Sequence, residues 1–237
     1  MSLELFNITK SFNNLQLFRD FNLKIDTGEF VTILGKNGIG KTTLLKIISK
    51  LDLEFSGKIS ASGTINYNLQ KPILLPWLKV YDNVILGLKI QKRLKNDTKE
   101  KVIQFFKDFE LDINLFDCYT DNLSGGEQQK IALIRTLILE GDIILLDEAF
   151  SAMDFKVRLE QQIKLYQLSK KYNKTVIFIT HNIDEALNMS DRILVFKNNP
   201  IEIVKDMKVN FGHKDVISNR THSDYNQKFT EIWKSLN

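Results

Sequence analysis

Residues 35–42 read Gly35-Lys36-Asn37-Gly38-Ile39-Gly40-Lys41-Thr42. This stretch matches in full the G-x-x-x-x-G-K-[ST] pattern of a phosphate-binding loop. An apolar run at 29–34 precedes it and a helical pattern at 41–51 follows it, which is the strand–loop–helix context that such a loop requires. Glycines let backbone N–H groups approach a phosphate, and the helix N-terminus adds positive potential. We therefore expect nucleotide phosphates to be held by Gly35, Lys36, Asn37, Gly38, Ile39, Gly40, Lys41, Thr42 and Thr43.

On both sides of this loop, short apolar runs alternate with helical patterns along the chain. The runs at 143–146 and 175–180 are continuous, as strands covered on both faces are, and the segment 155–171 between them is helical in pattern. Near the N-terminus, 3–8 and 21–25 alternate apolar with polar residues, which is typical of half-exposed antiparallel strands. These patterns predict an α/β fold with a parallel-sheet core and an N-terminal antiparallel β subdomain.

The segment from about 76 to 135 breaks this alternation and predicts an inserted helical subdomain. We interpret residues 1–237 as one P-loop domain, with a C-terminal tail from about 211 to 237. A short helix is expected in that tail, with Ser223 as its N-cap.

Composition limits the partners and the cellular compartment that we expect for this protein. Of 237 residues, 43 % are hydrophobic, enough for a core, and 33 basic against 29 acidic residues leave a net charge of only +4. That excess is too small to predict nucleic-acid binding. One cysteine favours a reducing compartment. We see neither a leader pattern nor an apolar run near the ~20 residues of a membrane span, so we expect a cytoplasmic protein unless a partner holds it at a membrane.

Two acids follow the apolar run 143–146. Asp147 at such a strand end is placed to bind Mg²⁺ opposite the Thr42 hydroxyl, while Lys41 contacts the β- and γ-phosphates. Glu148 is then placed to orient or deprotonate an attacking water. Many buried strands end in Asp, so this interpretation depends on the phosphate loop in the same chain.

Leu123-Ser124-Gly125-Gly126-Glu127-Gln128 is the third motif. Ser124 and Glu127 form the pattern of a capping box that starts a helix. A helix start with two glycines and a serine hydroxyl is also a site for an anion. A chain with its own phosphate loop has little use for a second phosphate site, unless that site serves the nucleotide of another chain.

Together these motifs resemble the ATP-binding cassette (ABC) ATPases over residues 1 to about 210. The Ser124 segment resembles their signature motif, Gln70 their Q-loop glutamine and His181 their switch histidine. Ser151-Ala152-Met153-Asp154 resembles the D-loop, with Met153 where leucine is commoner. Phe12 lies where an aromatic residue, usually tyrosine, stacks on adenine.

The resemblance implies an ATPase with ATP and Mg²⁺ as cofactors. It also implies that Gln70 and His181 act with Glu148 in catalysis, and that Gln70 is a ligand of Mg²⁺. It implies a head-to-tail homodimer in which each ATP is held by the phosphate loop of one chain and by Ser124, Gly125, Gly126 and Glu127 of the other, with Asp154 crossing the interface.

The segment Leu74–Val84 resembles the one after the Q-loop in bacterial importers of nitrate, sulfonate and taurine. This implies integral membrane permease subunits as partners and, through them, an extracytoplasmic solute-binding protein, with the chain at the cytoplasmic face of the membrane. Trp77 and Leu78 are candidate contacts to the permease, or they pack within the helical subdomain.

Three alternatives stay open. A soluble ABC ATPase acting on nucleic acid or ribosomes usually has two cassettes or a long coiled coil, and the gap from Lys41 to Ser124 holds no heptad run. A regulator without turnover would not need Glu148 or His181. A basic stretch on the helical insertion is either attracted to anionic lipid or simply a solvated face; it comprises Lys89, Lys92, Arg93, Lys95, Lys99 and Lys101.

Overall fold

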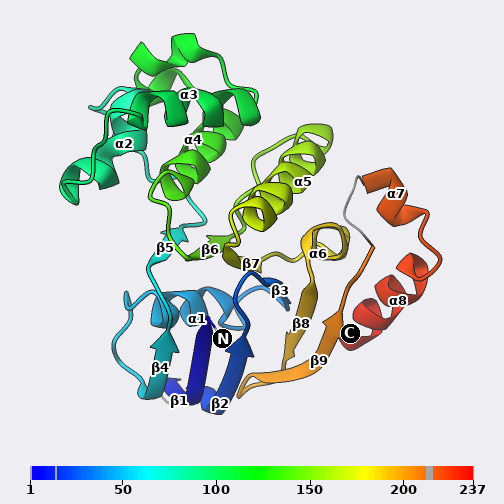
Figure 1. Ribbon diagram of the computed structural model, residues 1–237. Coiled ribbons are helices and arrows are strands. Elements are labelled where there is room, and N and C mark those ends of the chain that lie inside the picture. The colour runs from blue at the N-terminus through cyan, green and yellow to red at the C-terminus, as the bar shows by residue number, and fades with distance from the viewer. Residues whose placement is uncertain (1, 14, 212–215, 237) are drawn as a thin grey trace.

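A computed structural model describes residues 2–13, 15–211 and 216–236. The chain forms a central sheet with helices on its faces, a small β-sheet at one side and a group of helices that projects from the other (Figure 1). No helix within these described ranges is both long and apolar enough to cross a membrane.

The central sheet has six strands in the order β5-β6-β7-β3-β8-β9, and only β9 runs antiparallel to its neighbour. Strands β3, β6 and β7 are buried at every position, which explains their unbroken apolar sequences. The carboxyl ends of the parallel strands meet at one edge, so residues distant in the chain converge there. The strands are β3 (Phe30–Leu34), β5 (Ile65–Asn68), β6 (Ile143–Asp147), β7 (Thr175–Ile179), β8 (Arg192–Lys197) and β9 (Glu202–Lys208).

Helices that cover this sheet include α1 (Lys41–Ile48), α5 (Phe155–Lys171) and α6 (Ile183–Met189). Leu44, Leu45 and Ile48 of α1 are fully buried in one cluster with apolar side chains of β3, β6 and β7. This packing fixes the start of α1, and with it the phosphate loop, against the sheet.

The N-terminal sheet has the order β2-β1-β4 and is antiparallel. It is built from β1 (Leu3–Phe12), β2 (Leu15–Ile25) and β4 (Ser56–Ala61). Leu3, Leu5 and Ile8 are buried against the core, while the intervening side chains are mostly exposed.

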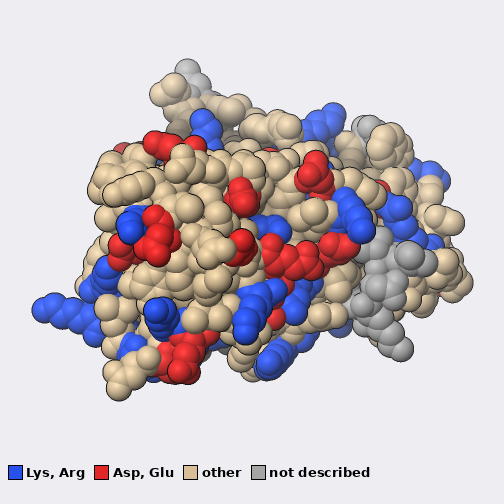
Figure 2. Space-filling view, turned by 90° about the horizontal axis from the view of Figure 1, so that it is seen from above, with Lys and Arg blue, Asp and Glu red and all other residues tan. Residues whose placement is uncertain are grey.

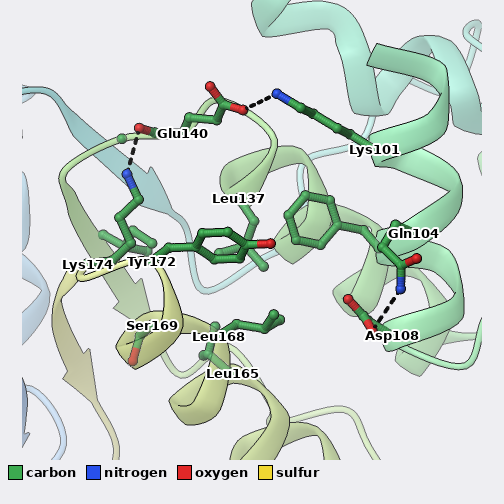
Figure 3. Close-up of a pocket in the computed structure, with 13 residues that line it drawn as sticks. Lys101, Gln104, Asp108, Leu137, Glu140, Leu165, Leu168, Ser169, Tyr172 and Lys174 are labelled. Carbon is green, nitrogen blue, oxygen red and sulfur yellow. Dashed lines mark hydrogen bonds and ion pairs between the residues drawn. The ribbon is translucent and has the colours of Figure 1, made fainter. Parts of the chain in front are cut away.

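The helical segment contains α2 (Val80–Ile90), α3 (Thr98–Asp108), two short 3₁₀ helices (Ile113–Asp117 and Thr120–Asn122) and α4 (Gly125–Leu137). Between α3 and α5 lies a hollow of about 390 Å³, lined by apolar side chains such as Leu165 and Leu168 (Figure 3). It contains no residue of the phosphate loop.

The tail contains α7 (Val216–Arg220) and α8 (Tyr225–Leu236). The Tyr225 hydroxyl donates to Asp184 Oδ1 at 2.6 Å, and Ile232 is fully buried, so α8 is tied to α6. The expected Ser223 cap is wrong by one residue: the Asp224 carbonyl accepts from Lys228 N at 2.9 Å and flanks the helix.

Other boundaries also differ from the sequence predictions. The helix expected at 41–51 ends at Ile48, and the N-terminal strands extend well beyond 3–8 and 21–25. The helix at 155–171 is confirmed at both ends, and the α/β fold with its mostly parallel sheet is confirmed. Four strands, β4, β5, β8 and β9, were not predicted.

Candidate nucleotide site

The phosphate loop leads directly into α1. Gly40 flanks the helix with φ 114°, and a Cβ there would lie 2.7 Å from Leu17 Cδ1. A Cβ on Gly35 would lie 2.9 Å from the Phe196 carbonyl oxygen. Gly40 therefore needs glycine for its backbone conformation, and Gly35 needs it because a backbone oxygen leaves no space for a Cβ. The result is a loop packed closely on β8 and β2.

Lys41 is held inside this loop. Its Nζ donates to the Gly35 carbonyl at 2.7 Å and to the Lys36 carbonyl at 3.0 Å, and the residue is only 5 % exposed. Burial lowers the pKa of Lys41, and the nearby Glu148 and Asp147 carboxylates oppose that change. An ammonium group confined among carbonyls is suited to bind an anion that enters the loop.

Asp147 ends β6 and is 1 % exposed. It accepts a hydrogen bond from the Tyr67 hydroxyl at 3.2 Å, and the Thr42 hydroxyl lies near enough to favour its charged form. Burial raises the pKa of Asp147 and outweighs the two hydroxyl groups. Tyr67 was missed by the sequence analysis. It reaches Asp147 because β5 pairs with β6, a neighbourhood that no local pattern reveals.

Glu148 is the meeting point of two other loops. Gln70 Nε2 donates to Glu148 Oε2 at 2.9 Å, and His181 Nδ1 lies 3.2 Å from Glu148 Oε1. Gln70 follows β5 and His181 follows β7, so strand ends bring the three together. Glu148 also has φ 48°, a conformation that a non-glycine residue holds only where its surroundings enforce it.

The signature segment forms a separate place. Ser124 Oγ accepts from Glu127 N at 3.3 Å, and Glu127 Oε2 accepts from Ser124 N at 2.8 Å, so the predicted capping box is confirmed. A hollow of about 420 Å³ lies beside it, lined by Ser124, Gly125, Gly126 and Glu127 and by Ala152, Met153 and Asp154. No phosphate-loop residue lines this hollow.

The D-loop is attached to the signature helix. The Gln129 side chain donates to Ser151 Oγ at 2.9 Å and accepts from Ala152 N at 2.8 Å. A Cβ on Gly125 would lie 3.6 Å from Ala152 Cβ. The signature segment and D-loop thus present one continuous surface.

Phe12 lies at the end of β1 and is 46 % exposed. Lys10 Nζ lies 4.7 Å from its ring centroid. One face of the ring is thus covered by Lys10, and stacking of adenine on Phe12 stays a prediction.

Comparison with known proteins places this site in a family. Residues 18–151 match the ABC transporter family. The chain belongs to that family. It is 37 % identical over 210 residues to the spermidine/putrescine import ATP-binding protein PotA of Aggregatibacter actinomycetemcomitans, an alignment that covers 84 % of this chain and 56 % of PotA. The cassette therefore spans little more than half the length of the PotA proteins it matches.

Two further relatives match over more of their length. The uncharacterized ABC transporter ATP-binding protein YtlC of Bacillus subtilis is 36 % identical, covering 92 % of this chain and 88 % of YtlC. The dimeric, post-hydrolysis structure of the ATP-binding cassette MJ0796 with ADP and Pi superposes with a TM-score of 0.79 at 28 % identity, covering 88 % of this chain and 99 % of that one. The cassette described here is thus an ABC ATPase, with ATP and Mg²⁺ as its cofactors.

The residues present fit both groups. Mg²⁺ prefers oxygen ligands, and the Thr42 hydroxyl and the buried Asp147 carboxylate lie near each other at the loop. Gln70 can add its amide oxygen. Gly38 leaves open space where a Cβ would project, so backbone can approach a phosphate. The roles of the individual residues stay predictions.

Asp147 gives a first test. Because burial raises its pKa above the ordinary 3.8, the folded carboxyl holds its proton more tightly than the unfolded one. Stability is therefore lost as pH rises through and above that value, and the charged carboxylate destabilises the ligand-free fold at neutral pH. We expect Asp147→Asn to raise the ligand-free melting temperature at pH 7 and to remove most of the stabilisation by Mg-ATP. A lower ligand-free melting temperature, measured by calorimetry, would contradict this account.

Proposed function

We propose that this cassette hydrolyses ATP as a head-to-tail homodimer and drives import of a small solute through separate membrane subunits. One observation carries the proposal: the two halves of the expected ATP site lie apart in a single chain. Lys41, Asp147 and Glu148 converge at the strand ends, whereas Ser124–Glu127 line a different hollow beside the D-loop. A second copy turned end to end brings the missing half to each loop.

Within each site the chain supplies a sequence of groups with distinct tasks. Lys41 and the loop N–H groups hold the phosphates, and Thr42, Asp147 and Gln70 would hold Mg²⁺, which would supply positive charge to neutralise them. Glu148 accepts a proton from the attacking water, while Gln70 and His181 keep its two oxygens oriented. The Ser124 hydroxyl and the N-terminal N–H groups of α4 face the nucleotide of the other chain.

The segment after Gln70 supports a membrane partner. The Asn83 side chain, fully buried, accepts from Leu75 N at 2.8 Å and donates to the Leu75 carbonyl at 3.0 Å and to the Leu78 carbonyl at 3.1 Å. These bonds fold the segment so that Trp77 is 69 % exposed. A large aromatic side chain held at the surface is the kind of group that anchors a protein interface.

The solute class rests on the Leu74–Val84 segment, which resembles importers of nitrate, sulfonate and taurine. The PotA relatives are named for spermidine and putrescine import, but the alignment with this chain covers only 56 % of PotA. We propose a small anion of the nitrate, sulfonate or taurine kind, delivered by an extracytoplasmic solute-binding protein. Binding of radiolabelled taurine, nitrate and putrescine to the solute-binding protein distinguishes an importer of small anions from an importer of polyamines.

Nucleic acid is not favoured as a partner. The face seen in Figure 2 carries Lys and Arg side chains interspersed with Asp and Glu. In the basic stretch, Lys89 pairs with Asp82 at 2.6 Å and Lys101 with Glu140 at 2.6 Å. Two of the six basic side chains in the stretch are thus partly neutralised, which weakens it as a site for phosphate backbones.

Capture from native membranes tests the proposal. Tagged Glu148→Gln protein, gently solubilised with Mg-ATP, is expected to bring down a multi-span permease. We expect Trp77→Ser to reduce that recovery at least several-fold, because it removes the exposed anchor. Ile90→Ser is the control, since Ile90 is a 73 % exposed apolar residue on α2 of the same helical segment. Recovery of ribosomal or DNA-repair proteins without a permease would overturn the importer function.

A further inference from the structure

A partly buried ion pair, between Arg158 with a side chain 26 % exposed and Glu185, joins the helix that follows the D-loop to the helix that follows His181. Arg158, on the first turn of α5, donates through Nη2 to the Met153 carbonyl at 3.2 Å and through Nη1 to Glu185 Oε1 at 3.4 Å. Glu185 lies on α6, and its side chain is 8 % exposed. The guanidinium therefore contacts the D-loop backbone and α6 at the same time.

The other Glu185 oxygen continues the connection. Glu185 Oε2 accepts a hydrogen bond from the Thr180 hydroxyl, and Thr180 Oγ1 also accepts from Asn182 N at 3.1 Å. Thr180 and Asn182 flank His181, whose Nδ1 faces Glu148. A continuous set of polar contacts thus runs from the Met153 carbonyl through Arg158, Glu185 and Thr180 to the segment that carries His181.

Stability alone does not account for this pair. Arg158 Nε is buried and makes no hydrogen bond to the described residues. An unpaired buried donor costs stability, and an ion pair whose arginine is 26 % exposed adds little, because solvent screens it. The planar guanidinium does, however, fix two acceptors on different elements in one geometry, which an apolar side chain cannot do.

We propose that Arg158 and Glu185 are positioning residues that couple the D-loop to the His181 segment within one chain. The inference rests on the proposed dimer. There, Asp154 and the signature segment face the nucleotide of the partner, while His181 and Glu148 face the nucleotide of their own chain. The pair therefore connects the two ATP sites, so that the geometry of one D-loop depends on the state of the other site.

The test is a double-mutant cycle with Arg158→Met and Glu185→Gln. We expect each single change to lower kcat roughly tenfold and the double change to lower it no further, because groups in one network are non-additive. ATP affinity, measured with a fluorescent nucleotide, is expected to stay within about twofold, since neither residue touches the phosphate loop. The Hill coefficient for ATP is expected to fall to about 1, which a merely structural role would not produce.

Two further variants keep the test decisive. Arg158→Lys keeps the charge but loses the planar fork, so we expect near wild-type melting temperature with kcat still reduced. Lys164→Met is the control: Lys164 also lies on α5 and makes one ion pair, to Asp108 at 3.1 Å, and we expect wild-type turnover. The coupling would be overturned if the wild type is active and Arg158→Met has the same kcat and Hill coefficient. Fully additive losses in the cycle would also overturn it. Either result leaves the ATPase function standing. A wild type without turnover would instead refute the proposed function.

Discussion

Replacing Glu148 by Gln is expected to reduce ATP turnover by roughly 10²- to 10⁴-fold, the usual contribution of a positioned general base. Both oxygens of Glu148 are engaged, one by Gln70 and one by His181, so the carboxylate is held where strand ends β5, β6 and β7 meet. The amide keeps the size of the side chain but cannot take a proton from water. Binding of Mg-ATP does not need that proton transfer and is expected to persist.

Steady-state phosphate release, followed beside nucleotide binding by calorimetry, checks this result. Glu160→Gln is the matched control, because Glu160 is an exposed acid on α5 away from the site. Equal turnover in Glu148→Gln and wild type would remove Glu148 from the role of base. Loss of binding together with turnover would show that the side chain holds the loop rather than the water.

Replacing Lys41 by Met is expected to weaken ATP binding about 10- to 100-fold, the range for losing hydrogen bonds from a charged donor. Lys41 is 5 % exposed, and its ammonium group donates to the Gly35 and Lys36 carbonyls, so nothing else in the loop can replace it. Met keeps most of the length of the side chain. The effect should therefore appear in affinity and not in folding.

The folding side of this prediction follows from the pKa. Burial lowers the pKa of Lys41, so the folded protein holds that proton less tightly than the unfolded chain, and the buried charge costs stability at neutral pH. The ligand-free melting temperature of Lys41→Met should equal or exceed that of wild type. Lys46→Met, on an exposed position of the same helix, should change neither property. A variant that melts early and binds ATP weakly would attribute the loss to unfolding instead.

Local sequence patterns predicted the parts of the fold that depend on neighbours in the chain. The start of α1 at Lys41, the capping box of Ser124 and Glu127, and both ends of α5 follow from such patterns. The strand β4 did not, because five of its six positions are exposed and it carries no hydrophobic period. The strand β8 has four buried apolar residues in a row, as β6 and β7 have, so its sequence indicates a buried strand equally well.

The residues of the candidate site also divide into those that local sequence patterns predict and those that they do not. Lys41, Asp147 and Glu148 follow from motifs with their own chemistry, whereas Gln70 and His181 depended on the order of motifs in a family. Tyr67, Asn83 and Arg158 were missed, because each acts through contacts that only the folded chain creates. The hydroxyl of Tyr67 meets a carboxylate 80 positions away, and no spacing rule for strands or helices anticipates such a pair.

If one chain holds only half of each ATP site, Glu148→Gln should form a dimer when it binds Mg-ATP, and its mass in solution measures this. Light scattering with Mg-ATP is expected to give twice the mass of one chain, and the mass of one chain without nucleotide. Adding Ser124→Arg to that variant should abolish the dimer while Mg-ATP still binds, because the bulky side chain fills the half that serves the partner. A Glu148→Gln chain that binds Mg-ATP and stays a monomer at every concentration would contradict the composite site.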